Sequence, residues 1–335
     1  MKITHIKLFL LSIIISFSGY TQENSEDSKQ KGHINLNKFR QMYQEFSSPN
    51  MFRTAAGAPG PAYYQQQADY KMDIELDDKN KRIYGNETIT YTNNSPDNLE
   101  YLWVQLDQNV RKKDSPSLEK DGSGARPFYR PSAFTNEFLN DPFDGGFNIE
   151  YVKDIGGKPL SYIINQTMMR IDLPSVLKSG EKVSFSLKWW YNIQDHVNQD
   201  GRSGYESFKG DGNRTYIIAQ FFPRMAVYNE VEGWQNHQFW GDGEFALPFG
   251  NYEVKITVPA DHILDATGEL QNRKEVFSKE MLKRYNRAKK TFDKPVLIVT
   301  QSEAEQAEKS FSNNKKTWHF KAQNVRDFAF ATSRK

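Results

Sequence analysis

The sequence contains no cysteine in its 335 residues. A disulfide framework is therefore impossible, and the fold must be held by core packing. Thiol catalysis is excluded for the same reason. A bacterial lipoprotein anchor is excluded as well, because it needs a cysteine at its cleavage site.

Histidine is scarce, and its spacing excludes one common zinc site. A zinc peptidase with an H-E-x-x-H motif places two His one helical turn apart and uses the Glu after the first His as general base. No two of the six histidines are four residues apart and none is followed by Glu; they are His5, His33, His196, His237, His262 and His319. The sequence also lacks a G-x-S-x-G nucleophile motif and a glycine-rich phosphate loop. We expect neither a catalytic nor a metal-binding residue in this chain.

Two weaker patterns have simpler explanations. Asp195 and His196 are adjacent, but neighbours in sequence do not make a catalytic pair. Asp200, Asp211 and Asp242 lie in Gly-rich segments without the spacing of a calcium-binding loop. Backbone turns account better for these aspartates.

A strong excess of one charge is missing too. The net charge is +2, and no run of Lys and Arg is dense enough to form a phosphate-binding stripe. We therefore expect no nucleic-acid partner. Aromatic residues make up 14% of the chain, which argues against wholesale disorder.

The N-terminus has the pattern of a secretory signal peptide. Lys2 and Lys7 precede an apolar run from Leu8 to Phe17, and small residues follow. The run is much shorter than the ~20 residues that cross a bilayer, so no membrane span is expected in the mature chain. We expect a signal peptide over residues 1–19, export to the periplasm or the medium, and a flexible leader over residues 20–66 with a possible short helix.

From residue 67 onward the sequence is typical of β-strands. Apolar and polar residues alternate over Tyr70–Asp77, Val183–Ile193 and Asn251–Val258, which predicts strands with one buried and one wet face. Arg82–Thr92 follows a turn at Asp78–Asn80 and predicts a hairpin. Further strands are expected at Leu102–Leu106, Ile149–Val152, Tyr162–Ile164, Met169–Leu173, Thr215–Phe222, Val296–Thr300 and Trp318–Ala322.

This pattern predicts a mainly β fold. The expected architecture has antiparallel sheets in a saddle-shaped or sandwich domain, with few short helices. One helix is expected near Lys279–Lys290, after Ser278 as its N-cap. Lys112–Phe147 and Gln194–Asn213 are expected to be long loops, which are often functional.

Several segments carry a family resemblance. The segments are Tyr70–Asp77 with Ile83–Glu87, the run Gly85–Tyr91, Ala219–Met225 with Val227–Tyr228, Asn251–Pro259, Ala266–Leu270, Trp318–Phe320 and Asn324–Ala331. In this order and spacing they resemble the N-terminal, non-catalytic domain of aminopeptidase-N-like zinc metallopeptidases (gluzincins), in the form of a bacterial subgroup. The resemblance covers the chain from about Tyr70 to its end.

The resemblance implies a catalytic domain that this sequence does not contain. The family's H-E-x-x-H motif and G-x-M-E-N substrate loop are both absent. The implied organisation is a β domain over residues 67–324, with residues 325–335 leading to the missing catalytic domain. Zinc and the peptide substrate would then be bound in the full-length protein, and this chain would be inactive alone.

One residue has an implied role at the substrate. In the family a Gln of this domain contacts the N-terminal residue of the substrate, and Gln220 matches that position. An amide suits the task, because its oxygen can accept from an ammonium and its nitrogen can donate to a carbonyl. A Gln that bonds only locally is the alternative. The sequence also departs from the family, which often has an acidic residue after this Gln where the chain has Phe221.

A different function remains open from the residues themselves. Trp189, Trp190, Trp234 and Trp240 could form a platform for sugar stacking, although Trp189 lies on the apolar side of its strand. The alternative hypothesis is thus a standalone exported β-sandwich that binds carbohydrate or protein.

Overall fold

The computed structural model describes residues 49–116, 128, 130–135, 139, 143–197, 201–241, 243 and 245–335. All of them belong to one compact unit, Gln41–Lys335. Strands account for 43% of the structure and helices for 11%, which confirms the mainly β class with antiparallel sheets and few short helices. Within the described ranges, no helix has the length and apolar character needed to cross a membrane.

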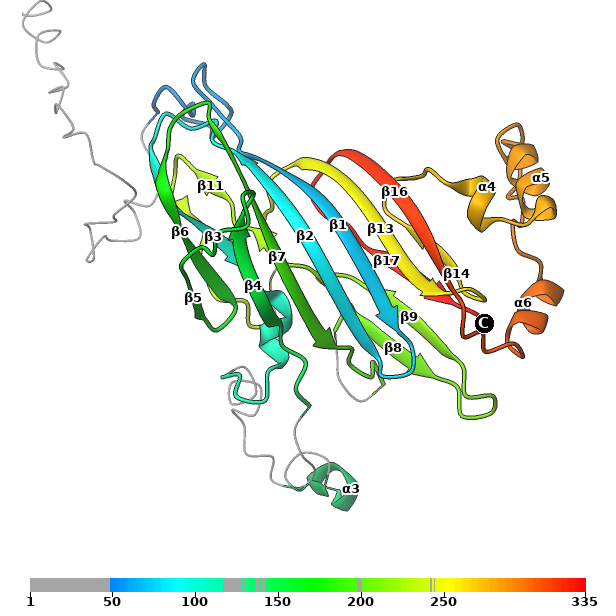
Figure 1. The fold of residues 1–335 in the computed structure, drawn as a ribbon. Coiled ribbons are helices and arrows are strands. Elements are labelled where there is room, and N and C mark those ends of the chain that lie inside the picture. The colour runs from blue at the N-terminus through cyan, green and yellow to red at the C-terminus, as the bar shows by residue number, and fades with distance from the viewer. Residues whose placement is uncertain are drawn as a thin grey trace, which may run out of the picture. The chain divides into compact units, whose positions relative to one another are not determined.

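A seven-stranded sheet forms the largest layer (Figure 1). Its strand order is β15-β16-β13-β1-β2-β7-β4. The strands are β1 (Gln67–Asp77), β2 (Arg82–Thr92), β4 (Asn148–Asp154), β7 (Lys182–Asn192), β13 (Gly250–Pro259), β15 (Glu269–Leu270) and β16 (Lys315–Val325). All neighbours are antiparallel except β1 and β13, which are parallel.

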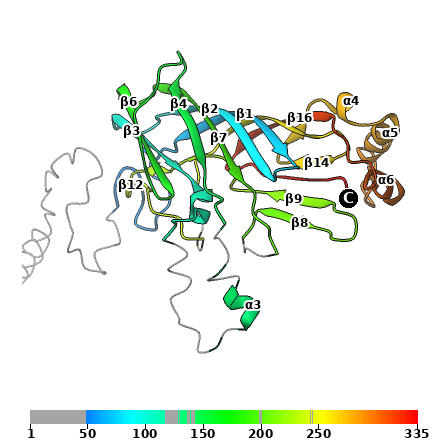
Figure 2. The ribbon, with the colours of Figure 1, turned by 60° about the horizontal axis from the view of Figure 1, so that its bottom comes forward.

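Smaller sheets pack at the two ends of this layer (Figures 1 and 2). One has the order β10-β3-β6-β5, from β3 (Leu99–Gln105), β5 (Tyr162–Asn165), β6 (Met168–Leu177) and β10 (Arg224–Met225). The other has the order β14-β17-β9-β8, from β8 (Gly204–Ser207), β9 (Arg214–Ile218), β14 (Ile263–Ala266) and β17 (Phe330–Ser333). A two-stranded ribbon pairs β11 (Tyr228–Asn229) with β12 (Gly233–Trp234).

The helices are short and lie between strands. They are η2 (Asp107–Arg111), α3 (Pro131–Phe134), α4 (Arg273–Val276), α5 (Lys279–Ala288) and α6 (Gln301–Ala307). The predicted helix after Ser278 is confirmed as α5, and the Ser278 hydroxyl accepts from the Met281 amide at 3.2 Å.

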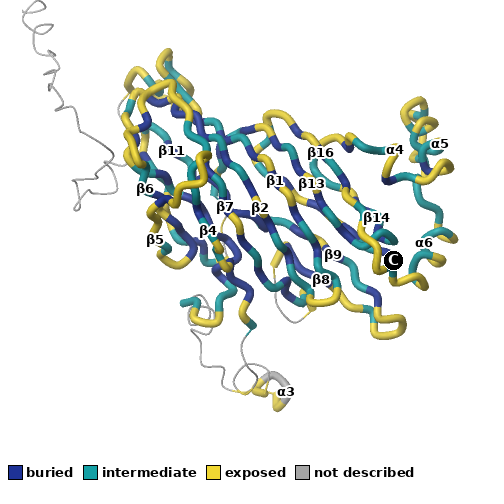
Figure 3. The backbone as a smooth tube through the Cα atoms, in the orientation of Figure 1, coloured by how far each residue is buried: buried dark blue, intermediate teal, exposed yellow. Residues whose placement is uncertain are grey.

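The alternating residues of the long sheet make the core (Figure 3). Met72, Ile74 and Leu76 of β1 are buried, whereas Lys71 and Asp73 between them are exposed. The same alternation holds in β2, β7, β13 and β16. The sheet therefore has one dry face, onto which the smaller sheets pack, and one wet face.

The chain crosses from one small sheet to the other between β9 and β10. Phe221 and Phe222 fill this crossing, and both side chains are fully buried. The Phe221 ring packs edge-on against Trp189 and Phe330, with centroids 6.4 and 5.3 Å away. Phe222 packs edge-on against Tyr70, at 5.4 Å. The crossing is thus anchored on the dry face of the long sheet.

Two expected strands differ from the structure. Val296–Thr300 is not a strand, and Leu297 within it is 69% exposed. The segment instead ends at the N-terminus of α6, where Thr300 and Glu303 form a capping box. The strand expected over Thr215–Phe222 ends at Ile218, because the chain leaves the sheet at the crossing.

The predicted domain limits remain predictions, but the structure describes parts of three segments. Residues 1–19 and the possible leader helix lie outside the described residues. Residues 49–66 include a bridge between Arg53 and Pro59. Within residues 325–335, β17 pairs with both β9 and β14.

Glu87 is a core carboxyl group that lacks a hydrogen-bond partner of good geometry among the described residues. Glu87 lies on the dry face of β2 and is 1% exposed, and neither of its carboxyl oxygens is paired among the described residues. Burial raises the pKa of Glu87 well above its usual range, and the neighbouring Trp189 indole offsets only part of that shift. Burial in the folded protein therefore favours the neutral form of Glu87.

We predict that Glu87→Gln removes a pH dependence of stability. Above the ordinary Glu pKa of 4.5, the unfolded chain loses this proton and the folded chain keeps it. The raised pKa therefore makes stability fall as pH rises, by up to about 1.4 kcal/mol per pH unit, until the folded pKa is reached. Urea unfolding between pH 5 and 8 should show the free energy of unfolding of Glu87→Gln rising, relative to that of the wild type, as pH rises. The control Glu100→Gln, at an exposed position, should keep the wild-type dependence of stability on pH. If the curves of Glu87→Gln and the wild type ran parallel, the raised pKa of Glu87 would be contradicted.

Gly85 is required where β2 faces Trp189. A Cβ built on Gly85 would lie 2.2 Å from the Trp189 Cζ2 atom, and Trp189 is fully buried. We predict that Gly85→Ala lowers the free energy of unfolding by about 1–3 kcal/mol, because the indole cannot move aside without repacking the core. A Cβ on Gly210 meets nothing within 4 Å, so Gly210→Ala serves as the control and should change stability by less than about 0.5 kcal/mol. Equal unfolding midpoints for both variants would refute the packing argument.

Candidate functional site

Gln220 lies at the start of the crossing between the small sheets. Its backbone has a φ of +51°, which is uncommon for a residue other than Gly. The Gln108 side-chain amide donates to the Gln220 carbonyl oxygen at 2.8 Å and so holds this backbone in place. The Gln220 side chain is half-buried and lines a pocket.

The pocket around Gln220 has a volume of about 300 Å³. Its lining combines aromatic and aliphatic side chains with charged ones: Asp107, Arg202, Ala219, Gln220, Arg224, Phe239, Phe245, Ala246, Leu247, Arg326 and Asp327. Such a mixture is typical of sites in which a few polar groups orient a partly apolar ligand.

One wall of the pocket is a buried ion cluster. Arg224 donates through Nε and Nη2 to the two carboxylate oxygens of Asp107, at 3.1 and 2.8 Å. Its third nitrogen, Nη1, donates to Asp327 Oδ2 at 2.7 Å. Side-chain exposure is 7% for Arg224 and 1% for Asp107. The cluster therefore ties β10 to η2 and to the segment before β17.

The charges of the cluster compensate one another. Burial alone would lower the pKa of Arg224, but Asp107 and Asp327 more than offset it and raise that pKa. Burial raises the pKa of Asp327, although 39% of its side chain is exposed, and Arg224 counteracts the shift only in part. Arg224 thus remains charged and its guanidinium nitrogens are taken up by the two carboxylates.

The polar groups near Gln220 suit a ligand with both a donor and an acceptor. The Gln220 side-chain amide makes no hydrogen bond to the described residues, so it can both accept and donate. Arg326 also lines the pocket, and its guanidinium has no carboxylate partner in the described part of the chain. The pocket can therefore present an amide and a positive charge to a ligand.

The sequence departure after Gln220 has a structural reason. Phe221, where the family often has an acidic residue, is fully buried against Trp189 and Phe330. An acidic side chain at this position would be desolvated in the same core. Phe221 therefore serves the packing of the crossing, whereas the neighbouring Gln220 lines the pocket.

The other candidates from the sequence lie elsewhere. Asp195 accepts a bond from the Val197 amide at 3.0 Å, and Asp211 pairs with Lys335 at 2.8 Å. Asp200 and Asp242 lie outside the described residues. Trp189 is confirmed as a core residue, whereas Trp190 packs under Arg82 at 4.6 Å.

No metal site is formed by the part of the chain that the structure describes. There, no three His, Asp or Glu side chains lie close enough together to hold an ion. The described residues therefore offer no donor set for a zinc ion.

Sequence reasoning missed the ion cluster beside Gln220. Arg224 is 117 residues from Asp107 and 103 from Asp327 in the chain. Nothing local in the sequence marks these three residues as partners. A cationic residue within the buried strand β10 was the one available hint, because a buried charge requires a partner.

Comparison with known proteins gives structural matches only. No family model matches the sequence, and no curated protein matches it. The solved structures that match include a point mutant of an M1 zinc metallopeptidase from Deinococcus radiodurans, with 12% identity, a TM-score of 0.41, and coverage of 82% of this chain and 44% of that chain. A mutant from the same organism bound to a Tyr-Ser-Ala substrate matches with 12% identity, a TM-score of 0.40, and coverage of 80% and 42%. This chain thus spans less than half of each solved chain.

We predict that the ion cluster is sensitive even to a change that keeps its charge. Arg224→Lys should lower the free energy of unfolding by about 3 kcal/mol, because a Lys cannot bond both carboxylates in this geometry and leaves buried charge unpaired. The matched control is Arg170→Lys, whose pair with Asp172 has side chains 44% and 41% exposed. It should cost less than about 1 kcal/mol. Chemical unfolding would measure both, and similar losses would show that the cluster at Arg224 has no special role.

Proposed function

We propose that this chain is the non-catalytic β domain of a zinc aminopeptidase. In this proposal it packs against a catalytic domain outside the sequence and helps to cap that domain's active site. The ordered sequence resemblance from Tyr70 to the C-terminus supports the family. The observation that carries the role is Gln220, an amide on a restrained backbone that lines a pocket.

Gln220 would contact the N-terminal residue of a peptide. Its side-chain oxygen can accept from the peptide ammonium and its nitrogen can donate to the first carbonyl. Because the Gln108 bond and the buried Phe221 fix the backbone on both sides, little ordering of Gln220 is needed on binding. Zinc belongs to the full-length protein and would be held outside this chain.

Export follows from the N-terminal pattern and is part of the proposal. An exported peptidase without cysteine needs no oxidising compartment for folding, since its core is made by packing alone. Cell fractionation followed by detection with an antibody to the chain should place the protein in the periplasm or the medium. A cytoplasmic pool with an intact residue 1–19 segment would argue against export.

The decisive experiment starts with the DNA beyond the codon for Lys335. An in-frame H-E-x-x-H motif downstream would supply the catalytic domain, and its absence would overturn the proposal. Where it is present, the longer polypeptide should release N-terminal residues from peptides in a zinc-dependent manner, whereas residues 1–335 alone should not. Activity of the short chain would overturn the division of roles.

We predict that Gln220→Met lowers kcat/KM of that longer polypeptide by roughly 10- to 100-fold. The substitution keeps the length of the side chain and removes only its hydrogen-bonding atoms, one of which would meet a charged ammonium. Gln306→Met on the exposed face of α6 is the matched control and should leave kcat/KM unchanged. Steady-state kinetics with a tripeptide would measure both. Equal activity of the two variants would mean that Gln220 bonds only locally.

A further inference from the structure

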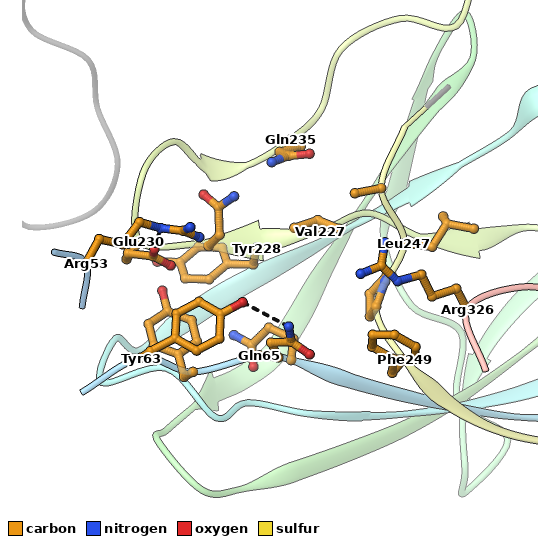
Figure 4. A pocket seen from close by; sticks show the side chains of 15 residues that line it. Arg53, Tyr63, Gln65, Val227, Tyr228, Glu230, Gln235, Leu247, Phe249 and Arg326 are labelled. Atoms are coloured by element: carbon orange, nitrogen blue, oxygen red, sulfur yellow. Dashed lines mark hydrogen bonds and ion pairs between the residues drawn. The ribbon is translucent and has the colours of Figure 1, made fainter. Parts of the chain in front are cut away.

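A second pocket adjoins the one at Gln220 and is lined by a largely different set of residues. It has a volume of about 180 Å³ and lies between residues 53–66, the β11–β12 ribbon and the segment before β13. It shares Ala246, Leu247 and Arg326 with the Gln220 pocket. In Figure 4, Arg53 and Glu230 lie at one end, and Phe249 with Arg326 lies at the other.

Two buried polar atoms of this pocket have no protein partner. The Glu230 side chain is 4% exposed, and its Oε1 is paired with Arg53 Nε. Its second oxygen, Oε2, and the hydroxyl of Tyr64 are both buried without a hydrogen bond to the described residues. Leaving such groups unpaired costs free energy, so native structures seldom contain them without a reason. Both atoms belong to residues that line the same pocket.

These groups can bond a ligand in complementary ways. Glu230 Oε2 can only accept a hydrogen bond. Burial raises the pKa of the Tyr64 phenol, so this group stays protonated and can donate. The side-chain amide of Gln235, which makes no bond to the described residues, can do both.

A charged ligand group would not be favoured at the end of the pocket where Glu230 and Arg53 lie. Arg53 already neutralises Glu230, so an ammonium group would gain little there. An anion would meet the carboxylate of Glu230 directly. A neutral ligand with several hydroxyl groups matches the unpaired donor and acceptors without this conflict.

The remaining lining is aromatic. Tyr63, Tyr228 and Phe249 contribute rings around the opening (Figure 4). Arg53 packs over the Tyr63 ring at 5.3 Å and Arg326 over the Phe249 ring at 4.5 Å, which holds both rings in place. Apolar ring surface beside hydroxyl-bonding groups suits the mixed surface of a sugar, whose C–H groups pack on rings while its hydroxyls bond polar atoms.

We propose that this pocket binds one neutral sugar residue. Glu230 Oε2 and the Tyr64 hydroxyl have almost no accessible surface in the free chain, so the Glu230 and Tyr64 side chains shift on binding. A sugar hydroxyl then donates to Glu230 Oε2, and another sugar oxygen accepts from the Tyr64 hydroxyl. The volume of the pocket matches a single sugar ring. The site does not depend on the peptidase proposal, since none of these polar groups is needed there.

Tyr64→Phe tests the site with little risk to the fold. The variant removes only a hydroxyl that has no protein partner, so its melting temperature should equal or exceed that of the wild type. The matched control is Tyr191→Phe, which also removes a buried, unpaired hydroxyl but lies in the core outside the pocket. Binding is measured by saturation-transfer NMR and by titration. The ligands are glucose, galactose, mannose and N-acetylglucosamine, followed by their β-linked disaccharides as models of the end of a glycan chain.

At least one of these sugars should bind the wild type and Tyr191→Phe equally. Tyr64→Phe should weaken that binding by roughly 3- to 10-fold, the size of one hydrogen bond. Preference for a disaccharide over its monosaccharide would identify a glycan end as the natural source, and equal affinity would identify the free sugar. No binding of any sugar, or binding that Tyr64→Phe leaves unchanged, would overturn the proposal. A third outcome would also overturn it: a trialanine peptide binds where the sugars do not, and Tyr64→Phe weakens that binding. The pocket would then be a peptide site.

Discussion

The packing of Phe221 and Phe222 under the long sheet determines where every other part of the pocket region lies. These two rings contact Trp189 of β7, Tyr70 of β1 and Phe330 of β17, so they touch the long sheet and one small sheet together. Because the dipeptide is fixed, β9 on one side and β10 on the other must join different small sheets. The left-handed backbone of Gln220 is the bend that this change of sheet requires.

The buried charges follow from the same crossing. Arg224 comes two residues after Phe222 and enters the interior beside β3, where water cannot solvate it. Its two carboxylate partners come from η2 and from the segment before β17, so charge compensation holds three distant segments together. Hydrophobic side chains of similar size could stabilise such a contact equally well. A salt bridge differs in being directional, and here it engages all three guanidinium nitrogens of Arg224.

The features that the sequence reveals are those governed by local pattern. β1, β2, β7 and β13 alternate because each has one dry and one wet face, and that alternation is visible in the residue order. The apolar run Val296–Thr300 has no such alternation, and the capping box of Thr300 and Glu303 was the better signal there. The partners of Arg224 and the φ of Gln220 depend on contacts more than 100 residues apart, so no local pattern could specify them. Gln220 itself was found only through resemblance, and its role at a substrate stays a prediction.

The two features on which the peptidase proposal depends share one small sheet. β9, which leads into Gln220, pairs with β17 from Thr215 opposite Ser333 to Ile218 opposite Phe330. The end of β17 is fixed in turn, because Arg334 is 2% exposed and bonds Asp78 at 3.0 Å and Asp261 at 3.1 Å. The segment predicted to lead toward a catalytic domain is therefore held in register with the strand that positions Gln220. A domain attached through this segment would have a defined placement relative to Gln220, which a flexible linker could not provide.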